Sequence, residues 1–274
     1  MNKQGCARPV NIVPPGPITG YANPHCYLGN TRNCCHTRSE EHYVSAAVLS
    51  KVDRLIRVSG VPWLGQGETR DLPIPALKAG ILCKRHNEAF SRLDLQASKF
   101  VEAILRFSDA SYNKQTRVAT FNGRDIERWM IKTLYGLLAS KSLQASVGQR
   151  INSKITTQCI DLLYDRLPLE HGRGLFVRAH PNYSVLAIRQ IQVTPVIKPS
   201  NSSLSGLRFN IGGFDFLLST CPINVEGGVF RPYELIFDNN TSSKVIELIW
   251  TEEQYNQVVV WKVNHSEMPP KEPD

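Results

Sequence analysis

The feature that most constrains this chain is a concentration of cysteine and histidine residues in its first third. Four of the seven cysteines lie between residues 26 and 83, and they are Cys26, Cys34, Cys35 and Cys83. Histidines stand among and beside them, at His25, His36, His42 and His86. The cysteine count is odd, and the N-terminus has no apolar stretch typical of a secretory signal, so we expect a cytoplasmic protein with reduced thiols. In that setting the clustering favours metal binding over disulfides.

Structural zinc is held by four Cys or His side chains in a tetrahedron. Cys83 and His86 are three residues apart, a spacing at which one turn presents both side chains to a single ion. The other two ligands then come from residues 26–36. Cys26 is the first of them, and the second is one of three neighbours, Cys34, Cys35 or His36. We favour Cys34, because it leaves six residues before Glu41.

Three stretches carry apolar residues at helical spacing, about 87–108, 124–140 and 150–166. Residues 43–58 are apolar enough for a short helix followed by an extended segment. These stretches predict a helical region in the middle of the chain.

From residue 173 the apolar period falls to two, which indicates strands over 184–198, 244–251 and 255–263. Gly212-Gly213 is typical of a turn between strands. We therefore expect an antiparallel β-rich C-terminal region.

Charge is distributed unevenly between the two halves of the chain. Residues 1–150 carry 21 Lys and Arg against 11 Asp and Glu, a net of +10, whereas residues 151–274 carry 11 against 13, a net of −2. A basic surface releases counterions when it meets phosphates, so this asymmetry is a modest indication of a nucleic-acid partner, and a solvated surface that only aids solubility explains it equally well. No stretch approaches the roughly 18 apolar residues of a membrane span. The sequence has no P-loop, no Gly-x-Ser-x-Gly elbow and no zinc-deaminase pattern.

Two segments carry most of the polar chemistry, and they read CYLGNTRNCCHTRSEEHYVS (26–45) and ILCKRHNEAFSRLD (81–94). Together they resemble the zinc-containing branch of the HNH endonuclease family, the ββα-metal nucleases. Glu41-His42 matches the acidic-His pair that closes a strand in that branch, and Cys83-x-x-His86 matches its second pair of zinc ligands, with His in place of the usual Cys. Asn87 follows at the head of a helix. The resemblance covers roughly residues 26–107, and the family's tight Cys-x-x-Cys first pair is absent here.

The resemblance implies phosphodiester hydrolysis with a catalytic divalent ion, Mg²⁺ or another, beside a structural Zn²⁺. His42 would be the general base, because an imidazole has a pKa near neutrality. Glu41 would reach the divalent ion, and Asn87 would orient the catalytic loop by hydrogen bonds. Asp94 lies seven residues after Asn87 on the same helix face and would replace the His or Asn that holds the metal in the family, with Ser91 as an alternative.

Five basic residues could line a track for phosphates, namely Lys84, Arg85, Arg92, Arg124 and Arg128. The expected partner is DNA, with RNA not excluded, and no membrane. A protein partner or oligomer contact is expected through the C-terminal region.

The sequence thus predicts an α+β protein with an N-terminal zinc-stapled ββα-metal module, added helices and an antiparallel β-rich region. The expected division is a Pro-rich arm (1–25), an HNH-like nuclease domain with a helical extension (26–145) and a mostly β-rich domain (146–274). The leading hypothesis is a DNA endonuclease, which in this family often serves bacterial defence. Two rivals are a catalytically inactive zinc module that binds nucleic acid or a protein, and a scaffold in which zinc is purely structural. A cysteine nucleophile paired with His42 is a minor alternative.

Overall fold

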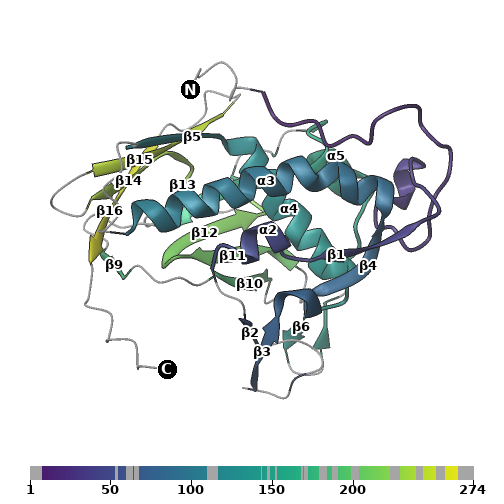
Figure 1. Cartoon of the computed structure of the whole chain (residues 1–274), viewed down its shortest axis with the longest axis horizontal. Coiled ribbons are helices and arrows are strands. Elements are labelled where there is room, and N and C mark those ends of the chain that lie inside the picture. The colour runs from purple at the N-terminus through teal and green to yellow at the C-terminus, as the bar shows by residue number, and fades with distance from the viewer. Residues whose placement is uncertain are drawn as a thin grey trace.

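The computed structural model describes residues 8–52, 55–59, 64, 68–109, 117–142, 144–146, 149–151, 153–167, 169, 172–178, 184–186, 191–198, 204–222, 229–238, 243–250 and 257–264. Residues 1–7 of the expected arm therefore lie outside the described part. The helices are α2 (Ala46–Leu49), α3 (Lys84–Phe107), α4 (Gly123–Ala139) and α5 (Thr157–Leu163), with 3-10 turns η1 (Gly29–Thr31) and η2 (Ile74–Ala76). The fold is a mixed α+β arrangement with few helices and several small sheets (Figure 1).

The two long helices follow the apolar periodicity closely. α3 buries a stripe of side chains that includes Phe90, Leu93 and Phe100 and leaves its opposite face in solvent. α4 differs, because every residue from Gly123 to Leu137 is buried. It begins at Asn122, whose side chain accepts a hydrogen bond from the backbone N–H of Asp125 (3.2 Å). A helix buried on all sides must also bury its charged residues, and α4 carries several.

The first sheet is antiparallel, as the alternating pattern predicts. Its strands lie in the order β10 (Ile191–Ile197), β11 (Leu204–Ile211), β12 (Phe214–Ser219), β8 (Gly174–Arg178) and β13 (Val229–Phe230). The β11–β12 hairpin turns at Gly212 and Gly213, which both have positive φ (62° and 93°). Gly213 donates its backbone N–H to the Asn210 side chain (3.0 Å), so the predicted turn is confirmed.

The second sheet is mixed rather than antiparallel. Its strands lie in the order β5 (Val118–Asn122), β15 (Ser243–Ile249), β14 (Pro232–Asp238), β16 (Gln257–Asn264) and β9 (Ser184–Leu186). β14 and β15 pair antiparallel, but the β15–β5, β14–β16 and β16–β9 pairs are parallel. Strand periodicity predicts a strand but not its partner, and here β5 from the middle of the chain completes a C-terminal sheet.

Three smaller pairs complete the described sheets, and one of them supports the metal site. β1 (Arg38–His42) pairs antiparallel with β4 (Lys78–Cys83), and β4 runs directly into α3. The other two are the hairpins β2 (Leu55–Ser59) with β3 (Thr69–Pro73), and β6 (Gln144–Ser146) with β7 (Gln149–Arg150).

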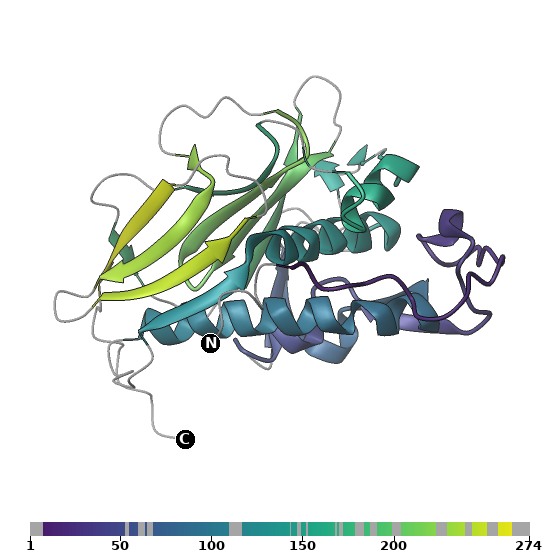
Figure 2. The same ribbon diagram turned by 90° about the horizontal axis from the view of Figure 1, so that it is seen from above.

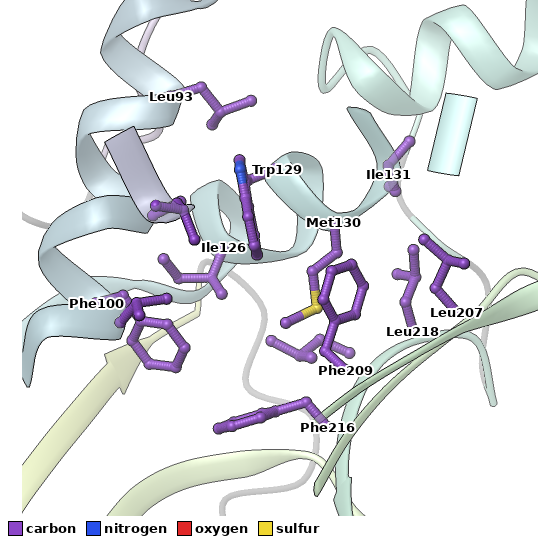
Figure 3. Close-up of a cluster of buried hydrophobic side chains, with 14 of the residues drawn as sticks. Leu93, Phe100, Ile126, Trp129, Met130, Ile131, Leu207, Phe209, Phe216 and Leu218 are labelled. Atoms are coloured by element: carbon purple, nitrogen blue, oxygen red, sulfur yellow. The ribbon is translucent and has the colours of Figure 1, made fainter. Parts of the chain in front are cut away.

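The core lies between the two long helices and the two larger sheets. Figure 2 shows the helices on one side of the strands, and the segment before β1 reaching away from the sheets. α4 contacts β11, β12 and β15, so it touches both sheets. In Figure 3 Met130 of α4 faces Phe209, while Phe216 lies toward Phe100 of α3. Within the described residues, no helix combines the length and hydropathy that a membrane crossing requires.

Candidate metal centre and buried ion cluster

Four buried side chains meet at the end of the molecule remote from the two larger sheets (Figure 1). Cys26 and Cys34 flank η1, Cys83 ends β4, and His86 lies in the first turn of α3. Their ligand atoms all lie within 4.8 Å of one another. The His86 Nδ1 atom is 3.2 Å from the Cys83 sulfur, 3.5 Å from that of Cys26 and 3.6 Å from that of Cys34.

The spacing and chemistry of this group fit a structural metal such as zinc. With Zn–S near 2.3 Å and Zn–N near 2.0–2.1 Å, a tetrahedral site separates S and N by about 3.6 Å. The other ring nitrogen of His86, Nε2, lies 3.3 Å from the Thr31 hydroxyl, which itself donates to the Leu28 carbonyl (2.8 Å). The Thr31 hydroxyl therefore accepts a hydrogen bond from the Nε2–H group, and the lone pair of Nδ1 faces the three sulfurs.

The pKa shifts of the four ligands differ, because burial makes two of the thiols hold their protons more tightly whereas it leaves the imidazole neutral. Burial raises the pKa of Cys26 and of Cys34. Burial also acts on Cys83, but backbone N–H groups of His86 and Cys35 outweigh it and lower the pKa of that thiol. Burial, and then the charge of Arg85, lowers the pKa of His86 to about 4. The imidazole is neutral at pH 7, the form that binds metal, and a bound ion would displace the thiol protons.

The structure also separates the three alternatives for the second ligand. Cys34 is in the group, whereas Cys35 and His36 are not. The Cys35 sulfur accepts the backbone N–H of Arg85 (3.3 Å), so it satisfies an amide in the first turn of α3. His36 is exposed and packs against the ring of Tyr21, with ring centroids 4.0 Å apart.

The two carboxylates expected to bind a catalytic ion converge, but around an ammonium. Glu41 of β1 and Asp94 of α3 both bind Lys132 of α4. The Lys132 Nζ atom is 2.5 Å from Glu41 Oε1 and 2.7 Å from each oxygen of Asp94. The side chains of Lys132 and Glu41 are 3% and 8% exposed, whereas that of Asp94 is 16% exposed, so the cluster is buried except at Asp94. A positive charge therefore already stands between the two carboxylates.

The charges in this cluster stabilise one another. Burial disfavours the charge on Lys132, but Asp94 and Glu41 outweigh burial and raise the pKa of the ammonium. Burial raises the pKa of Glu41, although Lys132 opposes the shift. The ring of Phe90 adds a cation–π contact, with its centroid 5.5 Å from the Lys132 nitrogen. Neutralisation by a buried lysine is what allows two carboxylates to face each other here.

His42 and Asn87 lie close to this cluster without joining it. His42 is half-buried, and burial followed by the charge of Lys78 lowers its pKa. The Ile74 backbone opposes this shift of the pKa, and the Nε2 atom of His42 is buried with no hydrogen-bond partner in the described part of the chain. Asn87 donates from Nδ2 to the Ser39 hydroxyl (2.7 Å), which ties α3 to β1 three residues before His42.

The residues predicted to bind phosphates differ in their exposure to solvent. Lys84 and Arg92 are exposed on α3. Arg85 is half-buried and structural, because its guanidinium donates to the Asn33 side chain (3.1 Å) and to the Pro17 carbonyl (3.0 Å). Ser91 is exposed and donates to the carbonyl of the residue three before it.

The expectation that Arg124 and Arg128 line a phosphate track is wrong. Both are buried, at 4% and 2% exposed, and are bound to neighbouring carboxylates. A charged residue in an amphipathic pattern predicts a solvated face, and only packing shows that α4 has no such face.

Two residues of the site, Lys132 and Thr31, were not among those predicted from the sequence. Lys132 directly follows the apolar residues 129–131 (WMI), and a cation there is the signal that would have predicted a buried ion pair. No sequence pattern would have identified Thr31, because its role depends on the ring orientation of His86.

In comparisons with known proteins, no protein-family model, no curated sequence and no solved structure matches this chain.

Proposed function

We propose that this chain is a zinc-stapled, HNH-like module that binds nucleic acid and does not cleave it through a divalent ion. The order β1, β4, α3 and the Cys/His centre support the likeness to the zinc-containing HNH branch. Lys132 carries the rest of the proposal, because its ammonium occupies the place between Glu41 and Asp94 where a catalytic ion would bind.

Coulomb repulsion prevents the Lys132 ammonium and a divalent ion from occupying the place between Glu41 and Asp94 together. Mg²⁺ sits 2.0–2.1 Å from carboxylate oxygens, and the Lys132 nitrogen is already 2.5–2.7 Å from three of them. A divalent ion at the same place would repel the ammonium in a medium of low dielectric constant. The side chains of Lys132 and Glu41 are buried, and only Asp94 of the three is partly exposed.

The nucleic-acid surface that we propose is formed by basic residues near the metal centre. Lys84 and Arg92 are exposed on one side of α3, and Arg38 is exposed at the start of β1. Glu88 is the exposed acidic residue between the two helical cations, and it lies 3.8 Å from Lys84. Phosphate contacts by these side chains would position a strand without reading its sequence.

Cleavage is the first test. Plasmid and single-stranded DNA are incubated with Mg²⁺, Mn²⁺ or no metal, with the wild type and His42→Ala compared at equal zinc content. We expect the same background in both proteins and no stimulation by either ion. Metal-stimulated cleavage that the His42→Ala variant loses would refute the proposal.

Binding is the second test, measured by fluorescence anisotropy of labelled DNA and RNA over a range of salt. We expect the affinity to fall with salt, and Lys84→Ala/Arg92→Ala to reduce the log–log slope by up to about 2, since each phosphate contact contributes roughly 0.9. Lys99→Ala removes an exposed cation further along α3 and is the matched control. Absence of salt-dependent binding in the wild type would favour the purely structural scaffold.

The second candidate is the divalent-metal DNA endonuclease, and His42 favours it. Its half-buried imidazole has an Nε2 atom with no hydrogen-bond partner in the described part of the chain, and imidazole is the side chain that most often acts as a general base. The Asn87–Ser39 hydrogen bond would hold the strand that carries it. Glu41 and Asp94 would then be the ion ligands, and Lys132 would have to leave them when the ion entered. The cleavage test distinguishes the two candidates.

A further inference from the structure

The arm that precedes the metal centre is clamped to α4 by two buried charges. The backbone N–H of Val10 donates to both carboxylate oxygens of Asp125 (3.0 and 3.2 Å), and Arg128 Nη1 donates to the Val10 carbonyl (3.0 Å). Asp125 and Arg128 are 3% and 2% exposed, and they also bind each other (3.3 Å). Both main-chain groups of one arm residue are therefore bound by α4 side chains.

The residues that follow alternate in the manner of a bound extended strand. Ile12 is 1% exposed and belongs to the core, and Pro14 is also buried. Asn11 and Val13 point outward, with Val13 42% exposed. Residues 15–20 are then exposed throughout. In Figures 1 and 2 the arm runs along the two long helices from α4 toward the metal centre.

The other end of the arm is held by the loop that carries a metal ligand. The Thr19 hydroxyl donates to the Cys34 carbonyl (2.7 Å), and the Cys34 backbone N–H donates to the Tyr21 carbonyl (3.0 Å). Arg85, beside the ligand His86, donates to the Pro17 carbonyl (3.0 Å). Four residues, 15–18, span the distance between the buried Pro14 and the anchored Thr19.

We propose that metal binding at Cys26, Cys34, Cys83 and His86 and docking of residues 10–14 on α4 are thermodynamically coupled through this short span. With the metal bound, docking closes a loop of four residues, 15–18. Without it, the span and the ligand loop keep only their hydrogen bonds to β4 and α3, such as that between Arg85 and the Pro17 carbonyl, and in the limit where these are also lost docking closes 23 residues, 15–37, back to β1. Loop-closure entropy scales as the 3/2 power of length, so the difference is on the order of tenfold in the docking equilibrium.

Coupling of this kind is reciprocal, so the metal and the arm strengthen each other by the same factor. The inference concerns the arm and the metal centre alone, and it holds whether or not the protein binds or cleaves nucleic acid.

The test measures both directions in the full-length protein. Zinc affinity is measured by competition with a chromophoric chelator for the wild type, Ile12→Ala and Val13→Ala. We expect Ile12→Ala to weaken zinc binding severalfold to tenfold, and Val13→Ala, an outward residue of the same segment, to match the wild type. Equal zinc affinity in all three proteins would overturn the proposal.

Hydrogen exchange of the wild type, with and without chelation of zinc, tests the coupling without a variant. We expect the Val10 amide to exchange roughly tenfold faster after chelation while β11 and β12 keep their protection. Loss of protection throughout the chain, or an unchanged Val10 amide, would each contradict it: the first means that the metal supports the whole fold, the second that the arm docks independently.

Discussion

Buried charged side chains gather around α4 in two clusters. Lys132, Glu41 and Asp94 form one cluster, and Arg124, Glu127 and Asp165 form part of another, also centred on α4. A buried ion pair is weak support for stability by itself, but removal of one partner leaves an uncompensated buried charge. The consequence can be measured at both clusters.

Replacement of Lys132 by methionine is expected to lower the free energy of unfolding by about 3–5 kcal/mol, because Glu41 and Asp94 would lose their only buried cation in the described cluster. Urea denaturation measures the change. Lys99→Met, an exposed lysine of α3, is the control and should change stability by less than about 0.5 kcal/mol. Adding Glu41→Gln and Asp94→Asn to Lys132→Met should recover part of the loss, and failure to do so would mean that lost packing dominates.

Asp125 predicts a pH dependence of stability. Burial raises its pKa from 3.8 to about 6, although Val10 and Arg128 oppose the shift. Because the folded value lies above the unfolded one, the contribution of Asp125 to stability is full below about pH 4 and is lost as the pH rises through 6. Between pH 7.5 and 5.5 it should add about 1 kcal/mol to the free energy of unfolding. The Asp125→Asn variant should lack that gain, and an identical pH profile in both proteins would refute the assignment.

At the scale of elements, α4 contains two glycines at which substitution by alanine is expected to change stability in opposite directions. A Cβ on Gly123, at the start of α4, would lie 2.5 Å from the Trp250 ring, whereas a Cβ on Gly136 would meet no atom closer than 3.5 Å. Gly123→Ala should therefore cost about 1–3 kcal/mol through overpacking. Gly136→Ala should add roughly 0.5–1 kcal/mol, because alanine favours the helix and restricts the unfolded chain. Thermal unfolding of the pair measures both, and equal signs would show that the packing around Trp250 is not as described.

At the scale of the whole molecule, one strand joins the two expected domains. β5 precedes α4, yet it pairs in parallel with β15 over five residue pairs, from Val118 with Val245 to Asn122 with Ile249. The predicted boundary at residue 145 lies inside β6, and it would separate β5 from the other four strands of its sheet. The boundary remains a prediction about folding units, and it can be tested by cutting the chain there.

Fragments 1–145 and 146–274 are expected not to fold separately, because the first would expose α4 and β5 and the second would lose an edge strand and its helical cover. Circular dichroism and hydrogen exchange of each fragment, alone and mixed in equal amounts, provide the measurement. Cooperative unfolding of an isolated fragment would show that the division at residue 145 is real. Structure regained only on mixing would show that the strand pairing joins the halves.

Local sequence pattern determined the two long helices, one turn and the residue types of the Cys/His centre. Apolar periodicity predicted the positions of α3 and α4, the Gly212-Gly213 turn was evident from its composition, and the clustering of thiols and imidazoles predicted the Cys/His centre, since metal ligands are specified by residue type and spacing. Tertiary structure decided the rest. Which of Cys34, Cys35 and His36 faces the centre depends on a loop path, and whether β5 joins the second sheet depends on long-range pairing. Whether Glu41 and Asp94 meet a metal or the ammonium of Lys132 depends on how α4 packs against α3 and β1. A charged side chain looks the same in sequence whether it will be solvated or buried against an opposite charge, and only the packing of the whole chain distinguishes the two.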